Sequence, residues 1–194
     1  MSVDNVNINS EDIDLIESFK NGNDRAFNYL VLKYQKKVYW LIRKMVIDHD
    51  EADDITQEVF IKIYSSLKDF RGESKFFTYL YKIAVNYSLN HIKRKKVIST
   101  RTADFESEAY KIESTERRTD ELMDDMKRNK ILEKAILSLP VQQRTVFNLR
   151  FYDELSYEEI SEILNKSVGG LKANYFHAMK KIESFLKSNK IFNM

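Results

Sequence analysis

The chain has 194 residues, of which 43% are hydrophobic and 32% are charged, and its formal net charge is only +2. This length accommodates one domain or two small ones. Because the sequence contains no cysteine, disulfides and thiolate metal sites are excluded, which fits a reducing compartment. The first ten residues lack a cationic, apolar leader pattern, and no apolar run is long enough to span a membrane, so we expect an intracellular protein without membrane insertion.

Residues that form turns are rare, since the whole chain holds four glycines and one proline. Sheet proteins need such residues frequently, whereas helical bundles do not. We therefore predict an all-α fold.

The N-terminal half shows hydrophobic residues at alternating spacings of three and four. This pattern predicts helices over residues 11–20, 24–47, 55–67 and 76–96. Asp24 is the expected N-cap of the second helix. We expect these helices to form one small bundle over residues 11–96, preceded by a disordered stretch over residues 1–10.

The periodicity fades over residues 97–129, where nine acidic and six basic side chains give a net charge of −3. Such a composition is typical of a flexible polar linker. A second helical bundle is predicted over residues 130–188, followed by a tail over residues 189–194. Its last three helices are expected over residues 140–151, 157–164 and 168–186, the first of them beginning at the only proline.

The stretch "LSYEEISEILNKSVGGLKAN" (155–174) predicts a helix-turn-helix motif. Its first helix is acidic and ends near Asn165, a residue type that readily adopts a left-handed backbone. Residues 166–190 instead contain six lysines and one glutamate, as a helix in a DNA major groove requires. Phosphates would repel the acidic helix, so it should face away from the duplex, towards a protein. The alternative is that the lysines form an ordinary solvated helix face.

The fourth predicted helix carries a polar stripe beside its apolar one. The apolar stripe contains Phe76, Leu80, Ile83, Ala84 and Tyr87, and the polar stripe contains Lys75, Tyr79, Lys82, Asn86, Asn90 and Lys93. Lysines can follow the phosphates of single-stranded nucleic acid while an aromatic ring stacks on a base. Because the apolar stripe supplies the core, no packing role is expected for Tyr79. An ordinary solvated face with one exposed tyrosine is the alternative.

Six carboxylates and no Lys or Arg occur between Asp48 and Glu58. A calcium loop would need alternating ligands around a glycine, which this stretch lacks. We interpret it as a docking surface for a basic protein. The chain shows no P-loop, no nucleophile–base pair and no metal-ligand spacing, so we predict no catalytic site, no cofactor and no enzymatic activity.

Three sequence motifs follow one another along the chain: "DDITQEVF" (53–60), "FRGESKFFTYLYKIAVN" (70–86) and "LPVQQRTVFNLRFYDELSYEEISEIL" (139–164). Together they resemble the extracytoplasmic-function (ECF) sigma factors of bacterial RNA polymerase, over nearly the whole chain outside the first ten residues and the linker. The resemblance implies a cytoplasmic, alternative sigma factor that responds to stress or to the cell envelope. Its implied partners are promoter DNA and the core polymerase, through the coiled coil of the largest subunit and the flap. Whether an anti-sigma factor also binds is left open.

By position, the resemblance implies three surfaces. The core-polymerase surface comprises Asp53, Asp54, Gln57 and Glu58. The minus-ten surface, which would hold an extruded base, comprises Arg71, Lys75, Phe76, Tyr79, Lys82, Asn86 and Lys93. The minus-thirty-five surface comprises Lys172, Asn174, His177, Lys180 and Lys181. Many relatives carry arginine at the positions of Asn174 and His177. Arginine favours guanine, whereas asparagine favours adenine. The family's usual upstream sequence is therefore not assumed for this chain.

Two other classes of protein are the rivals. A helix-turn-helix regulator that acts without replacing a sigma factor would bind closed duplex unaided, usually as a dimer on a palindrome. A sigma factor would bind duplex weakly by itself and core polymerase tightly. A helical enzyme that modifies nucleic acid is disfavoured by the missing catalytic constellation.

Overall fold

The computed structural model describes residues 6–101 and 130–189, and all regular secondary structure within these ranges is helical. The prediction of an all-α chain is therefore confirmed. Most of the predicted linker lies outside the described residues. Of the stretch expected to be disordered, residues 1–5 lie outside the described residues, and the amide of Ser10 donates to the carbonyl of Asn7 over 3.0 Å.

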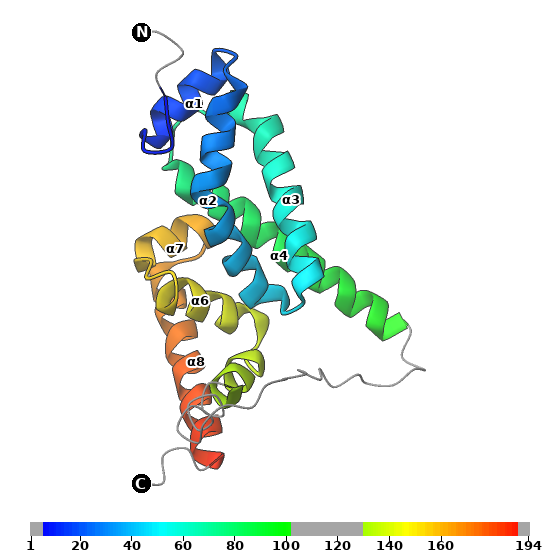
Figure 1. The fold of residues 1–194 in the computed structure, drawn as a ribbon. Coiled ribbons are helices and arrows are strands. Elements are labelled where there is room, and N and C mark those ends of the chain that lie inside the picture. The colour runs from blue at the N-terminus through cyan, green and yellow to red at the C-terminus, as the bar shows by residue number, and fades with distance from the viewer. Residues whose placement is uncertain (1–5, 102–129, 190–194) are drawn as a thin grey trace, which may run out of the picture.

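The N-terminal bundle is built around one long central helix, α2, which packs against three neighbours (Figure 1). Its elements are α1 (Asp12–Lys20), α2 (Asp24–Val46), α3 (His49–Ser66), the short 3-10 helix η1 (Leu67–Asp69) and α4 (Phe76–Arg101). The N-cap of α2 is Asn23, whose side chain accepts from the amide of Arg25, so the expected cap at Asp24 is wrong by one residue. An asparagine amide oxygen caps as well as a carboxylate does.

Helix α4 continues to Arg101, past the predicted end at residue 96. Residues 97–101 contain neither glycine nor proline, so nothing in the backbone stops the helix there. Their weak apolar periodicity reflects exposure, because Val97 and Ile98 are 43% and 61% exposed.

The C-terminal bundle contains a helical segment over residues 130–137, then α6 (Val141–Phe151), α7 (Tyr157–Leu164) and α8 (Val168–Ser188). Pro140 is the N-cap of α6 rather than its first residue. Helix α7 ends at Asn165, which has φ 51° and ψ 51°, so the predicted left-handed stop is confirmed. The hydroxyl of Ser161 donates to the carbonyl of Lys166 over 2.6 Å and so ties α7 to this turn.

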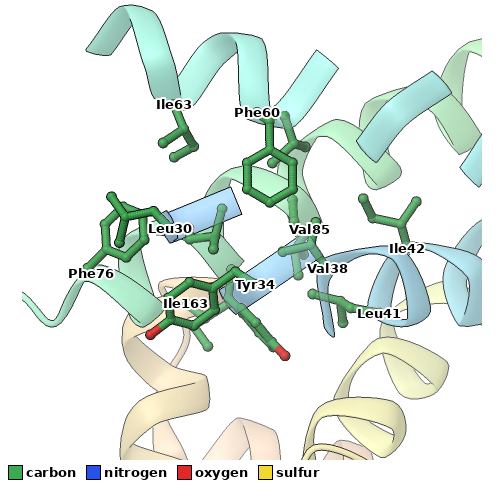
Figure 2. Packing of buried hydrophobic residues seen from close by; sticks show 14 of the residues in the cluster. Leu30, Tyr34, Val38, Leu41, Ile42, Phe60, Ile63, Phe76, Val85 and Ile163 are labelled. Atoms are coloured by element: carbon green, nitrogen blue, oxygen red, sulfur yellow. The ribbon is translucent and has the colours of Figure 1, made fainter. Parts of the chain in front are cut away.

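The two bundles pack against each other, which no sequence pattern had indicated. Helix α6 contacts α2, and α7 contacts α4. Ile163 of α7 is 2% exposed and belongs to the same hydrophobic cluster as Leu30, Tyr34 and Val38 of α2 (Figure 2). A smaller cluster, which includes Ala135, Phe147 and Ala178, belongs to the C-terminal bundle alone.

Two polar side chains of α6 cap the end of α2. Arg144, which is 7% exposed, donates from Nη2 to the carbonyl of Met45 over 2.9 Å. Asn148 donates from Nδ2 to the carbonyl of Lys44 over 3.2 Å. The last carbonyls of any helix lack partners within that helix, and a cation there is also favoured by the helix dipole. The C-terminal bundle thus completes the hydrogen bonding of a helix in the N-terminal one.

A buried carboxylate lies at the same junction. Burial raises the pKa of Asp153 to about 6, against the opposing effect of Lys44 and Lys37 of α2. Burial also lowers the pKa of Lys44, whose Nζ lies 4.2 Å from the centroid of the Tyr152 ring. An ionised Asp153 therefore disfavours the packed state, and a protonated one does not.

Leu30→Ala should lower the free energy of unfolding by about 2–5 kcal/mol, because it opens a cavity at a side chain that is 1% exposed. Leu32→Ala, two residues further along α2 at a side chain that is 54% exposed, is the control and should change it by about 0.5 kcal/mol or less. Urea titration followed by circular dichroism measures both. Equal losses would contradict the assignment of the core face of α2.

Asp153→Asn should stabilise the packed protein at pH 7, because asparagine carries no charge to bury. The raised pKa means that the stability contributed by protonated Asp153 is fully present below the ordinary value of 3.8 and is lost as the pH rises through about 6. The free energy of unfolding of the variant should be higher than that of the parent by roughly 1–2 kcal/mol at pH 7, and nearly the same near pH 4. Thermal unfolding at both pH values measures this, with Glu154→Gln as the control for losing an exposed carboxylate. A gain that is the same at both pH values would contradict it.

Candidate nucleic-acid interface

The acidic surface expected to bind a protein lies on the outer face of α3. Asp53, Asp54, Gln57 and Glu58 are all exposed, while Ala52, Ile55 and Val59 of the same helix are buried. A spacing of one, four and five residues places the four polar side chains on one side of a helix. The carboxylate of Asp53 contacts His49 one turn earlier on the helix, with 3.0 Å between Nδ1 of His49 and Oδ2 of Asp53.

One carboxylate of the acidic run points inward instead. Glu51 lies 2.6 Å from Nζ of Lys95 and 3.1 Å from Nε2 of His91, both on α4. These contacts fix the register between α3 and α4. The acidic surface and the polar stripe of α4 are therefore carried by one rigid pair of helices.

The loop between η1 and α4 is anchored at both ends. Phe70 and Phe76 are 9% and 4% exposed, and Nζ of Lys20 donates to the carbonyl of Phe70. Gly72, with φ 73°, makes the sharp turn between them. Arg71 and Lys75 project from this loop into solvent.

Phe76 does not belong to an exposed binding surface. Its ring centroid lies 5.5 Å from that of Tyr34 and 6.2 Å from that of Phe70, inside the core. In this conformation the ring is therefore buried, and the expected contact between Phe76 and DNA stays a prediction. Phe76 packs in the core at the end of this loop. Its place in the apolar stripe of α4 had already indicated that it would be buried.

Tyr79 is half-buried and has a packing role, contrary to expectation. Its hydroxyl donates to Oγ of Ser66 over 2.8 Å, and its ring centroid lies 5.0 Å from that of Phe70. These contacts fix the ring between η1 and α4 while leaving part of it accessible. A ring held in this way loses little side-chain entropy when a base stacks on it.

The remaining stripe residues, Lys82, Asn86 and Lys93, are exposed. The structure brings Lys75, Tyr79 and Lys82 together around one depression. Lys93 borders a different depression, beside Glu58 of α3. At about 1.5 Å per residue, Lys93 lies roughly 27 Å along the helix from Lys75.

The upstream candidates lie on α8. Lys172, His177, Lys180 and Lys181 are exposed, whereas Asn174 is partly buried and donates from its amide to the carbonyl of Gly170 over 2.8 Å. To read a base edge with that group, Asn174 would have to release this bond. The first turn of α8 is capped by Ser167, whose side chain accepts from the amide of Gly170.

Sequence reasoning missed Phe176, which is 54% exposed on α8. Nζ of Lys180 lies 4.6 Å from the centroid of its ring, and His177 meets the ring edge. The signal was available, because Phe176 falls outside the apolar stripe of Leu171, Tyr175, Ala178 and Ile182. An exposed aromatic residue among cations suits contact with bases.

Within residues 6–101 and 130–189, none of the helices combines the length and apolar character that crossing a bilayer requires. A groove of about 720 Å³ separates the two bundles on one side. It is lined mainly by apolar side chains, including Trp40, Ile47, Leu132, Ile136 and Tyr152.

Comparison with known proteins supports the division into two bundles. The family description "Sigma-70 region 2" matches residues 30–97, and "Sigma-70, region 4" matches residues 129–182. Among solved structures, CnrH in complex with the cytosolic domain of CnrY gives a TM-score of 0.66 at 20% identity, covering 92% of this chain and 97% of that one. The sigma factor RpoE of Bartonella quintana, solved with the anti-sigma factor NepR, gives 0.66 at 20% identity and covers 83% and 96%. These two structures show the same fold.

Sequence relatives extend the likeness to the family. The RNA polymerase sigma-H factor of Pseudomonas aeruginosa is 40% identical, over 91% of this chain and 94% of its own length. The ECF RNA polymerase sigma-E factor of Escherichia coli is 36% identical, over 88% and 91%. Because these similarities run through both bundles in the same order, the chain belongs to the extracytoplasmic-function sigma factors of bacterial RNA polymerase.

Proposed function

We propose that this sigma factor selects promoters through three surfaces: the acidic face of α3 for core polymerase, the α4 stripe for the minus-ten element, and α8 for the minus-thirty-five element. The observation that supports this division best is the order of the two matched regions, each of which contains one of the exposed basic surfaces. A regulator that acts without replacing a sigma factor would need only the C-terminal bundle.

The proposed core-polymerase surface is Asp53, Asp54, Gln57 and Glu58. These exposed side chains share one side of α3, which the contacts of Glu51 hold firmly against α4. Complementary charge steers two proteins together and fixes their register. A basic helical surface on the polymerase, as the family resemblance implies, is the matching partner.

The proposed minus-ten surface comprises Arg71, Lys75, Tyr79 and Lys82, with Asn86 and Lys93 further along α4. Unpairing a base costs a few kcal/mol. Stacking it on a ring returns roughly 1–3 kcal/mol, so binding can drive opening without ATP. The surface needs only placed cations and a ring, and accordingly we propose no catalytic chemistry and no cofactor.

The proposed minus-thirty-five surface is the exposed side of α8. Lys172, Lys180 and Lys181 supply phosphate contacts, and His177, Asn174 and Phe176 supply contacts to base edges. Phosphate contacts position the helix, and base contacts give sequence preference. This separation of roles predicts different effects for the two groups of side chains.

We also propose a cytoplasmic location, where polymerase and promoters are found, and an anti-sigma factor as a further partner. The Bartonella relative was solved with such a factor. The apolar groove between the bundles supports the same proposal, since a helix with an apolar face fits a groove of this kind.

Run-off transcription with purified core polymerase tests the proposed function as a whole. We expect transcripts from matching promoters only when the protein is added, and weak binding of the protein alone to closed duplex. Tight, palindrome-specific duplex binding without polymerase would instead favour a conventional regulator.

The double variant Asp53→Lys with Glu58→Lys should weaken core-polymerase binding by roughly 2 kcal/mol or more, because reversed charges at an interface repel. The control is Asp14→Lys with Glu17→Lys on α1, which makes the same change in charge at two exposed positions. Fluorescence titration with core polymerase measures both. An unchanged affinity in the α3 variant would refute this docking surface.

Tyr79→Ala should lose about 1–3 kcal/mol of stability, because it removes the ring that packs on Phe70, and it should also reduce promoter melting. Tyr79→Phe keeps the ring and removes only the hydroxyl that donates to Ser66. Its free energy of unfolding should therefore fall by about 1 kcal/mol or less, and it should melt the promoter normally. Urea unfolding and permanganate footprinting of the minus-ten element measure the two effects. Normal melting by Tyr79→Ala would eliminate the stacking role.

A further inference from the structure

The loop over residues 71–75, called the minus-ten loop below, carries Arg71 and Lys75 of the proposed minus-ten surface. Both side chains are exposed, so their positions depend mainly on the path of the loop backbone. That path is set where the loop begins and ends, at Phe70 and Phe76, which are both buried. The contacts that hold these two ends therefore decide where the two cations stand.

The start of the minus-ten loop is held by helix α1. Nζ of Lys20, the last residue of α1, donates to the carbonyl of Phe70. This carbonyl belongs to the planar peptide unit that joins Phe70 to Arg71, so the contact fixes the orientation of that plane. A charged donor also makes a stronger hydrogen bond than a neutral one. Lys20 thus fixes the direction in which the chain enters the loop.

The far end of the minus-ten loop is held from the opposite end of the same helix. Asp12, the first residue of α1, accepts a hydrogen bond from the hydroxyl of Tyr34 and lies 2.7 Å from Nζ of Lys33. The ring of Tyr34 packs edge-on against Phe76, the first residue of α4, with 5.5 Å between the ring centroids. Burial raises the pKa of Tyr34, and the bond to Asp12 acts in the same direction, so the hydroxyl remains a donor.

Helix α1 is itself fixed in the core of the N-terminal bundle. Leu15, Ile16 and Phe19 are at most 1% exposed. The ring centroid of Phe19 lies 5.6 Å from that of Phe27 and 5.3 Å from that of Tyr64. Because α1 is packed in this way, its first and last residues are held at a constant separation and can act as two fixed supports.

We propose that α1 is a positioning element for minus-ten selection, in which its first and last residues hold the two ends of the minus-ten loop and so place Arg71 and Lys75 beside the extruded base. This inference rests on the proposed function of the minus-ten surface. Lys20 and Asp12 act through the backbone and the buried ends of the loop and do not touch DNA. Helix α1 ends before residue 30, where the match to region 2 begins.

The effect should fall on the choice of base rather than on affinity for core polymerase. Hydrogen bonds to a base edge weaken steeply when donor and acceptor leave their preferred distance and angle. A loop that shifts freely offers its cations to every base about equally, whereas a fixed loop favours the base that fits. Loss of an α1 contact should therefore bring transcription from the best promoter and from the others closer together.

The test is run-off transcription with the full-length protein and core polymerase, on promoters that differ at a single minus-ten position. The measured quantity is the ratio of transcript from the best base to transcript from the other three. Lys20→Met keeps an unbranched side chain but removes the donor, and it should lower the largest ratio at least about threefold. Lys20→Arg keeps a charged donor and should retain most of the ratio. The control, Lys36→Met, removes an exposed lysine from α2 and should leave the ratio unchanged.

A second variant tests the other end of the loop. Tyr34→Phe removes only the hydroxyl that donates to Asp12 and keeps the ring that packs on Phe76. It should lower the same ratio at least about twofold. Thermal unfolding of each variant monitors the fold. Ratios that match those of the parent in both variants, or a loss of transcript that is equal on every promoter, would overturn the inference.

Failure of the proposed function gives a different result. If the parent itself transcribes all the minus-ten variants equally, the loop does not select a base, and the inference falls with the proposed minus-ten surface. If the parent discriminates and Lys20→Met discriminates equally well, α1 has no part in the selection while the surface stands.

Discussion

The arrangement depends on helix α2, whose buried side chains run from Ala26 to Val46 and meet neighbours from both bundles. It packs against α1, α3 and α4, and its carboxyl end is completed by Arg144 and Asn148 of α6. Because carbonyls that are buried without partners are costly, closing the junction over the end of α2 requires the hydrogen bonds from Arg144 and Asn148. The position of α7 over the α4 stripe follows from that junction.

Local signals were enough to predict the helices, the turn at Asn165 and the outward face of α3, because each depends on residues close in sequence. The junction between the bundles was not predictable in the same way. Arg144 and Met45 are 99 residues apart, and neither stands out in a periodic pattern. The hydrogen-bond partner of a buried arginine in an otherwise amphipathic helix can be identified only from the folded structure.

The candidate site was predicted in part, and two assumptions limited the prediction. Phe76 was assigned to a surface from its place in a motif, although the apolar stripe that includes it already indicated burial, and the packing of Tyr79 on Phe70 was not foreseen. Phe176 was missed because only polar side chains were considered on α8. Exposure depends on what neighbouring helices cover, and the coverage of α4 by η1 and α7 is a tertiary property.

The length of α4 sets how readily the two bundles meet. Its last turns extend away from the bundle as a continuous helix to Arg101, so the connection to residue 130 is 28 residues rather than the 33 first expected (Figure 1). A chain of that length spans at most about 100 Å even when fully extended. The C-terminal bundle therefore stays within a small volume around its partner, at an effective concentration of the kind that short tethers give. Closure is then nearly independent of how much protein the cell contains, because both bundles belong to one chain.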